Sequence, residues 1–259
     1  MLVIKLNMQK NTILILAFLW MFPLTLLGDC IQTKIEAEAT SNEEQPLKIV
    51  AFGNSITAIR NTIDQVFAQR LPSLLMAEGI KAEVINSGIP GSHTGSIKDH
   101  DLFKIKHARD RFETDVLAHE PDLVIIGFGT NDAHIDGSEP DGQSRIPLKQ
   151  YKRNLKFMIK ELQNIGVDVI LIAPNGLRGK YPEYQNVRLG QYVEVVKKLS
   201  VKYNTGLVDN FKLFSAYYAQ DKLGEELLLD GVHPNDKGHA LMAENLCMEI
   251  VRMKVERNK

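Results

Sequence analysis

The chain has few cysteines and almost no excess charge. Its 259 residues include two cysteines, and 31 Lys and Arg stand against 32 Asp and Glu, for a formal net charge of −1. Two cysteines do not make a disulfide framework, and Cys247 falls in an expected helix, where it would act as a small buried hydrophobe. The balanced charge gives no reason to expect nucleic acid or another polyanion as a partner.

The apolar run at residues 12–27 is too short to span a bilayer, which takes roughly 20 residues. It follows Lys10 and Asn11 and ends before Gly28. A basic start, a short apolar core and small residues after it are typical of a secretory signal, which we place at residues 1–28. We therefore expect an exported protein, with a signal of bacterial type, that is periplasmic, secreted or held at the cell surface.

The segment Leu-Leu-Gly-Asp-Cys that ends at Cys30 resembles a bacterial lipobox, in which the lipidated cysteine would tether the protein to a membrane. Asp29 departs from the small residue usual at that place, so lipidation of Cys30 and free secretion both stay open. Residues 29–46 are polar and acidic, and we expect them to form a flexible tether. A single domain over residues 47–259 follows.

Strands and helices alternate through this domain, with no internal repeat and no second domain. Apolar runs bounded by Gly, Pro or Asp predict strands at residues 47–52, 81–86, 122–129, 168–173 and 206–209. Apolar residues at helical spacing predict helices at residues 64–78, 106–119, 147–165, 187–203, 211–219 and 235–255. This alternation indicates a parallel sheet covered by helices on both faces, a three-layer α/β/α sandwich.

The first strand ends in Gly-Asn-Ser, and ligands of open α/β sheets bind beyond the carboxyl ends of the strands. Ser55 therefore lies where a nucleophile is expected, although a serine alone could equally be a helix N-cap. Partners for it must come from other strand ends or from the last loop. Four short segments fall at such positions: Ser55, the glycine loop at residues 86–91, Asn131, and Asp230 with His233.

These segments resemble the four blocks of the SGNH subgroup of GDSL-type hydrolases: Gly-Asp-Ser, a glycine loop, Gly-x-Asn-Asp and Asp-x-x-His. The resemblance covers residues 47–251 and keeps the family's block order. It implies a flavodoxin-like strand order 2-1-3-4-5 and a serine esterase. One block departs, because Asn54 stands where the family usually has Asp. We interpret Asn54 as a tolerated variant, since its amide oxygen can still accept a hydrogen bond.

The resemblance, transferred position by position, makes Ser55 the nucleophile, His233 the base and Asp230 the acid that orients the base. A serine hydroxyl needs a base to take its proton, and an imidazole titrates near neutral pH. A carboxylate on the other ring nitrogen fixes the tautomer. The resemblance also implies three oxyanion donors, the backbone N–H groups of Ser55 and Gly91 and the side-chain amide of Asn131.

Other site types fit less well. The chain has no G-x-S-x-G motif and Asp230 lies three residues before His233, which argues against an ordinary α/β-hydrolase. The glycines of residues 86–95 lack the G-x-G-x-x-G spacing of a dinucleotide site, and the seven histidines lack paired ligand spacing. We therefore expect no cofactor and no metal. Cationic and aromatic side chains that could border the crevice, or simply be solvated, are Arg111, Arg178, Lys180 and Tyr181.

We expect an exported serine esterase that acts on short acyl groups, with O-acetyl esters on carbohydrate as the favoured substrate. The partner would then be a small-molecule or glycan ester. A lysophospholipase or thioesterase-like enzyme is one alternative, because pocket shape decides the acyl chain length. A non-catalytic glycan-binding module on a degraded hydrolase scaffold is another, suggested by Asn54. Asp132 is expected to tie down its loop rather than to react.

Overall fold

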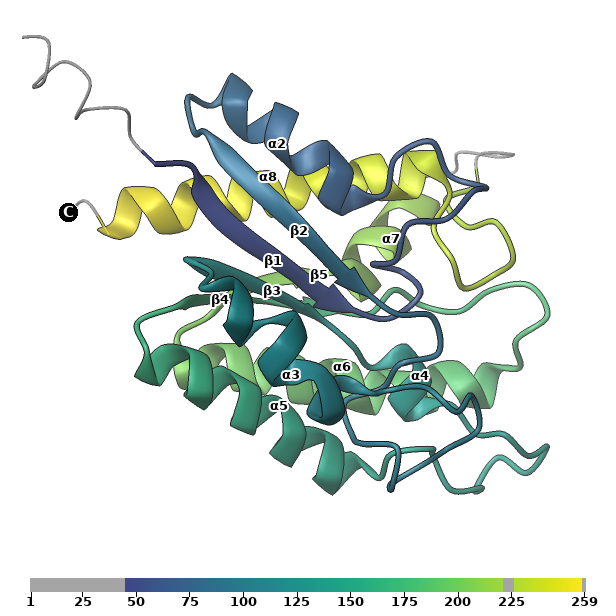
Figure 1. The fold of residues 1–259 in the computed structure, drawn as a ribbon. Helices are drawn as coiled ribbons and strands as arrows, with labels where there is room; N and C mark the ends of the chain where they lie inside the picture. The colour runs from purple at the N-terminus through teal and green to yellow at the C-terminus, as the bar shows by residue number, and fades with distance from the viewer. Residues whose placement is uncertain (1–44, 221–225, 258–259) are drawn as a thin grey trace, which may run out of the picture. The chain divides into compact units, whose positions relative to one another are not determined.

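The computed structural model describes residues 45–220 and 226–257 of the chain. The expected signal at residues 1–28 lies outside them, as does the tether up to residue 44, so both stay predictions. The described part of the chain forms a five-stranded sheet with helices on both faces (Figure 1). This confirms the predicted three-layer α/β/α sandwich.

The sheet is parallel throughout and its strands lie in the order β2-β1-β3-β4-β5, which confirms the flavodoxin-like order. The strands are β1 (Leu47–Gly53), β2 (Ala82–Gly88), β3 (Leu123–Gly127), β4 (Asp168–Ala173) and β5 (Gly206–Asp209). Because β1 pairs with both β2 and β3, the order reverses at β1. Its last residue, Gly53, lies opposite Gly88 and Gly127. A ligand crevice is expected at such a reversal, beyond the carboxyl ends of the strands.

The helices cover the sheet in two groups (Figure 1). They are α2 (Phe67–Ala77), α3 (Ala108–Asp115), α4 (Thr130–Ala133), α5 (Leu148–Asn164), α6 (Glu183–Tyr203), α7 (Asn210–Tyr218) and α8 (Asp236–Arg257), with a 3-10 turn η1 (Leu117–His119). Side chains of α2, α7 and α8 pack in one hydrophobic core, and side chains of α3, α5 and α6 pack in the other.

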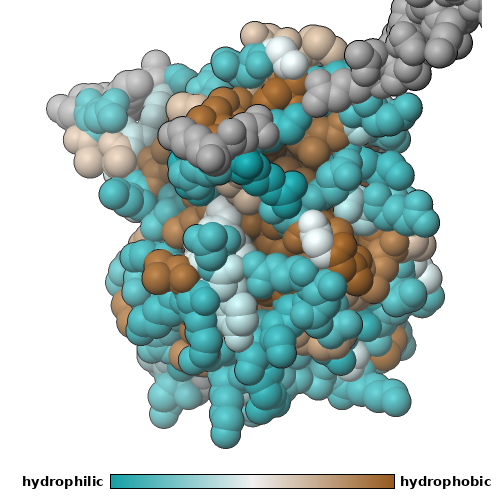
Figure 2. Space-filling model, turned by 90° about the vertical axis from the view of Figure 1, so that its left-hand side faces the viewer, coloured by the Kyte–Doolittle hydropathy of each residue, from teal (hydrophilic) through white to brown (hydrophobic). Residues whose placement is uncertain are grey.

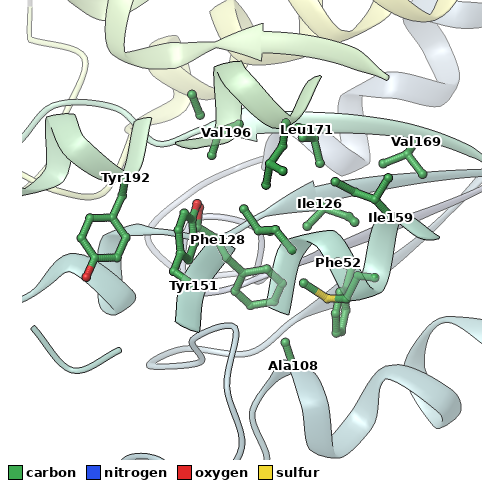
Figure 3. Packing of buried hydrophobic residues seen from close by; sticks show 14 of the residues in the cluster. Phe52, Ala108, Ile126, Phe128, Tyr151, Ile159, Val169, Leu171, Tyr192 and Val196 are labelled. Carbon is green, nitrogen blue, oxygen red and sulfur yellow. The ribbon is translucent and has the colours of Figure 1, made fainter. Parts of the chain in front are cut away.

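Strand β1 shows how the sequence supplies both cores. Val50 and Phe52 belong to the core on the α3, α5 and α6 side, whereas Ile49 and Ala51 belong to the core on the α2 and α8 side. Successive side chains of a strand point to opposite faces, so a strand buried on both faces must be apolar throughout. Phe52 meets Phe128 edge-on at 5.1 Å between ring centroids, and both belong to the core that also contains Ala108 and Tyr151 (Figure 3).

Helix boundaries differ from the prediction where distant contacts intervene. Helix α2 begins at Phe67 rather than at residue 64, because the backbone N–H groups of Asp64 and Gln65 donate to the carboxylate of Asp236 at the start of α8. The helix predicted over residues 106–119 is interrupted at Val116 and resumes as η1. Helix α6 begins four residues earlier than predicted, and the short helix α4 was not predicted.

The face of the molecule at the amino ends of the strands is shown in Figure 2. Hydrophilic side chains cover most of its lower part, and hydrophobic side chains gather above and around the middle (Figure 2). Over the described ranges, no helix is both long enough and apolar enough to cross a bilayer. The carboxyl edge of the sheet, which carries the candidate site, lies at the opposite end of the strands.

Candidate functional site

Ser55 lies in the turn that follows β1, and Asn54 shapes this turn. The Asn54 side-chain Oδ1 accepts a hydrogen bond from the backbone N–H of Ile56 at 2.9 Å. Its backbone carbonyl accepts from the N–H groups of Thr57 and Ala58 at 3.1 and 3.0 Å. Asn54 is only 2% exposed. The amide oxygen thus accepts a hydrogen bond within the turn, as the interpretation of Asn54 as a tolerated variant requires.

His233 and Asp230 reach Ser55 from the loop before α8. The Nε2 atom of His233 lies 2.9 Å from Ser55 Oγ, and its Nδ1 atom lies 2.7 Å from Asp230 Oδ2. The second carboxylate oxygen, Asp230 Oδ1, accepts from the backbone N–H groups of His233 at 2.9 Å and Val232 at 3.2 Å. With a carboxylate at Nδ1, that nitrogen carries the hydrogen and Nε2 accepts from the hydroxyl of Ser55.

The surroundings set the protonation states of this pair. Burial lowers the pKa of His233 below its usual 6.5, and the positive charges of Arg60 and Lys180 lower it further. The hydrogen bond with Asp230 opposes this shift without cancelling it. Burial would raise the pKa of Asp230, but hydrogen bonds from His233 and Val232 bring it down to about 2. At neutral pH the imidazole is therefore neutral and beside a carboxylate, the state in which it can accept a proton.

The glycine loop lies directly against the Ser55 turn. The backbone N–H of Ile89 donates to the carbonyl of Gly53 at 3.1 Å, and Asn86 Nδ2 donates to the carbonyl of Thr57 at 2.7 Å. Gly91 has a φ of +79°, and a Cβ there would come within 2.7 Å of the ring of Phe103. Both the backbone conformation and the close ring require glycine at this position.

Asn131 and Asp132 connect the loop after β3 to the glycine loop. Asn131 Nδ2 donates to the Ser92 carbonyl at 3.0 Å, and its Oδ1 accepts from Arg145 at 3.3 Å. These bonds fix the orientation of the amide, whose nitrogen carries a second hydrogen that can meet an oxyanion. The carboxylate of Asp132 accepts from both the backbone N–H and the hydroxyl of Thr94. Asp132 thus ties two loops together, as predicted.

Arg111 is neither a crevice residue nor a solvated cation. It is 1% exposed, and its guanidinium donates to the carbonyl oxygens of Ser87 and Gly53, both at 2.8 Å. The same group lies over the ring of Phe52, 4.3 Å from the centroid. Arg111 therefore holds the carboxyl ends of β1 and β2 together. No local pattern around an isolated arginine reveals such a contact.

Other side chains surround the loop that carries His233. The backbone N–H of Arg178 donates to the carbonyl of Gly231 at 2.8 Å, and a Cβ on Gly231 would lie 3.3 Å from the ring of Tyr181. The segment around Tyr181 therefore does border the site. Arg60, whose charge acts on His233, belongs to no motif and was not singled out from the sequence. Over the described ranges, no three His, Cys, Asp or Glu side chains are grouped so that they could hold a metal ion.

Comparison with known proteins adds an independent line of argument. A family model described as GDSL-like lipase/acylhydrolase matches residues 51–241. A lipase/acylhydrolase from Enterococcus faecalis has a similar structure, with a TM-score of 0.63 and 31% identity over 78% of this chain and 94% of that chain. The lipoprotein YqeF of Bacillus subtilis, itself uncharacterized, is 29% identical over 225 residues, 76% of this chain and 87% of that protein.

An acetylxylan esterase of Geobacillus stearothermophilus is 27% identical over 168 residues, 64% of this chain and 71% of that protein. Each of these proteins is a relative of partial identity, and its name describes that protein alone. The family match, in contrast, spans most of the chain and includes Ser55, Gly91, Asn131, Asp230 and His233. Because this match extends over far more than half of the residues, and the fold is shared with a solved lipase/acylhydrolase, the chain belongs to the GDSL-like lipase/acylhydrolase family.

Proposed function

We propose that this protein is an exported serine esterase that hydrolyses short-chain carboxylic esters, with O-acetyl groups on carbohydrate as the main substrate. The observation that carries the activity is one continuous hydrogen-bonded chain of side chains. It runs from Ser55 Oγ to His233 Nε2 at 2.9 Å and from His233 Nδ1 to Asp230 Oδ2 at 2.7 Å. Nucleophile, base and orienting group in this geometry are the requirement for acyl transfer through serine.

In the proposed first half-reaction, Ser55 Oγ attacks the ester carbonyl carbon while His233 Nε2 takes the hydroxyl proton. Asp230 stays ionised and stabilises the imidazolium. The oxyanion accepts hydrogen bonds from the backbone N–H groups of Ser55 and Gly91 and from the amide of Asn131. Loss of one such donor typically costs about 10²–10³ in turnover. His233 then gives its proton to the leaving alcohol, the C–O bond breaks, and the acyl group remains on Ser55.

In the second half-reaction, water takes the place of the alcohol. His233 accepts a proton from this water as its oxygen attacks the acyl carbon, and the same donors hold the second oxyanion. The intermediate collapses when His233 returns the proton to Ser55 Oγ, so the carboxylic acid leaves and the enzyme is restored. The neutral state of His233 at neutral pH supports this role as base, because only an unprotonated imidazole can begin either step.

The substrate class and the location of the protein rest on the relatives and on the amino terminus. One relative is named an acetylxylan esterase, which supports O-acetylated carbohydrate as the substrate, and another is named a lipoprotein, which supports export. In this proposal residues 1–28 are the signal, residues 29–46 the tether, and residues 47–259 the catalytic domain. In a membrane-bound protein, Cys30 is then lipidated and tethers the protein to the membrane. In a secreted protein, Cys30 is instead absent or remains unmodified.

The first test compares the full chain with its Ser55→Ala variant on p-nitrophenyl acetate. We expect kcat to fall by about 10³-fold or more, because a serine triad without its nucleophile keeps only residual catalysis. Ser138→Ala is the matched control, since Ser138 is exposed and its hydroxyl donates to the neighbouring Glu139 at 3.4 Å. Equal rates for the wild type and Ser55→Ala would contradict the proposed mechanism.

A second measurement decides among substrate classes. Rates on p-nitrophenyl acetate, on a long-chain p-nitrophenyl ester and on acetylated xylo-oligosaccharides should favour the acetyl compounds. A strong preference for the long acyl chain would support the lysophospholipase or thioesterase-like alternative instead. Binding of acetylated glycans without any hydrolysis would support the non-catalytic glycan-binding alternative.

A further inference from the structure

A small cavity lies against the inner side of the Ser55 turn. It is lined by residues at the carboxyl ends of β1, β3 and β4 and by the first residue of α7. The space open to the centre of a water-sized sphere is about 10 Å³. Phe67 and Met242 contribute to its apolar wall. Its polar lining comes from four segments: the Ser55 turn with Asn54 and Thr57, and three others with Thr130, Asn175 and Asn210.

Three of these lining residues carry a buried polar side-chain atom. Thr130 Oγ1, Asn175 Oδ1 and Asn210 Oδ1 are each inaccessible to solvent and have no hydrogen-bond partner in the part of the chain that the structure describes. The orientation of Asn175 is well defined, because its Nδ2 donates to the carbonyls of Val232 at 3.0 Å and Gly176 at 3.2 Å. Buried polar atoms almost always have a partner, so three such atoms around one cavity point to a shared one.

One water molecule matches these three atoms in number and in kind. It can donate its two hydrogens to Asn175 Oδ1 and Asn210 Oδ1, and its oxygen can accept the hydroxyl hydrogen of Thr130. Buried waters in proteins typically make about three hydrogen bonds, and a cavity of about this size holds one of them.

The side chains around the cavity are linked to each part of the site. Asn54 directly precedes Ser55, and Thr130 directly precedes Asn131. Asn175 donates to the carbonyl of Val232, the neighbour of His233. A group bound between these side chains therefore touches the turn of the nucleophile, the segment of the side-chain oxyanion donor and the loop of the base.

We propose that the cavity binds one ordered water molecule that joins these three segments, and that Thr130, Asn175 and Asn210 are positioning residues for Ser55, Asn131 and His233. The proposal of a water site depends only on the cavity and on the polar atoms around it. The positioning role rests on the proposed esterase function. Asn54 completes the wall of the site as a neutral side chain, so no buried charge competes for the water.

The direct test is a high-resolution crystal structure of the full chain. It should show a single density peak at about 2.7–3.1 Å from Thr130 Oγ1, Asn175 Oδ1 and Asn210 Oδ1. A cavity without density at that position would overturn the proposal. This readout does not depend on turnover. A peak in a protein that hydrolyses no ester would therefore contradict the proposed function and leave the water site intact.

The second test is Thr130→Val, which keeps the shape of the side chain and removes its hydroxyl. If the water is bound, it loses one of its partners, so the melting temperature should fall. We also expect kcat to fall by about two- to tenfold with little change in KM, the equivalent of one hydrogen bond. Thr130→Ser keeps the hydroxyl and should restore kcat, which a purely steric effect of the valine would not explain.

Thr205→Val is the matched control, because the Thr205 hydroxyl donates to the carbonyl of Gly206 at the amino end of β5, away from the cavity. Its kcat should equal that of the wild type. A dry cavity predicts the opposite stability change for Thr130→Val, since removal of an unpartnered buried hydroxyl stabilises a protein. A higher melting temperature would therefore overturn the water site, and an unchanged kcat would overturn the positioning role.

Discussion

Asn54 illustrates how one neutral side chain shapes the turn that carries Ser55. Its amide oxygen accepts the N–H of Ile56, and the residue is almost fully buried. A carboxylate at this place could accept the same hydrogen bond but would bring a charge into a poorly solvated position, which is costly without a partner. The asparagine therefore keeps the geometry of the turn and avoids a buried charge. This is why its presence does not argue against an esterase.

In the proposed mechanism, the pH dependence of turnover comes from His233. Burial lowers its pKa below 6.5, with further lowering by Arg60 and Lys180, and the base must be unprotonated to act. We expect kcat/KM, measured by acetate release, to rise with pH and to reach half of its plateau below pH 6.5. Arg60→Gln removes one of the positive charges and should move this midpoint upward.

The control for this shift is Arg153→Gln, the same charge change at an exposed position on α5. It should leave the midpoint where it is in the wild type. A midpoint clearly above pH 6.5 in the wild type would show that another group titrates. A midpoint that Arg60→Gln does not move would show that the charge of Arg60 does not act on the imidazole.

At the scale of elements, two histidines join the glycine loop to α3. The rings of His93 and His107 stack with 3.4 Å between their centroids. His93 Nδ1 accepts from the backbone N–H of Gly95 at 3.1 Å, and His107 Nδ1 accepts from the backbone N–H of His93 at 3.3 Å. Both acceptor nitrogens must be unprotonated. The segment that follows Gly91 is thus held by groups that acid would disrupt.

Acid should therefore destabilise this segment. Burial, with the nearby His107, lowers the pKa of His93 to about 4, whereas an unfolded histidine titrates near 6.5. The unfolded chain takes up the proton first, so this contribution to stability is complete above pH 6.5 and is lost as the pH falls from 6.5 to about 4. His93→Asn keeps a side-chain acceptor but cannot be protonated. With this substitution, the melting temperature should decrease less steeply as the pH falls through that range.

The comparison with wild type isolates His93 from other titrating groups. Burial raises the pKa of Asp132 to about 6, so its contribution grows as the pH falls and opposes that of His93. Because Asp132 is present in both proteins, its effect cancels in the difference. His119→Asn in η1, outside the stacked pair, is the control and should keep the wild-type slope. An equal slope for His93→Asn and wild type would contradict the assignment.

Local pattern predicted the elements better than their ends and their links. Strands β4 and β5 have the predicted bounds, because polar or turn residues close these short apolar runs and leave little choice of where each strand begins and ends. The start of α2 was placed too early because Asp236, far along the chain, accepts the N–H groups of Asp64 and Gln65. The positions of Ser55 and His233 followed from short motifs. The role of Arg111, which depends on distant carbonyls, did not.

At the scale of the whole molecule, the sheet and both cores belong to one stretch of chain. Every strand and helix that the structure describes lies between Leu47 and Arg257. Strand β1 pairs with both β2 and β3, so the first element of this stretch is an interior strand of the sheet. The first residue of β1 is already hydrogen-bonded to the rest of the domain, because the backbone N–H of Leu47 donates to the carbonyl of Lys81 at 2.9 Å. The site is assembled from the same stretch.

Residues 47–259 should therefore fold and act without the preceding 46. Every strand pairing and both cores remain, so we expect kcat/KM on p-nitrophenyl acetate to equal that of the full chain within about twofold, and the melting temperature to agree within about 2–4 °C. A chain that begins at residue 54 is the control. It lacks β1, which leaves β2 and β3 without their common neighbour, and it should not fold. If residues 47–259 instead unfolded or lost activity while the full chain did not, the amino-terminal segment would be part of the catalytic domain. The division into signal, tether and domain would then be wrong.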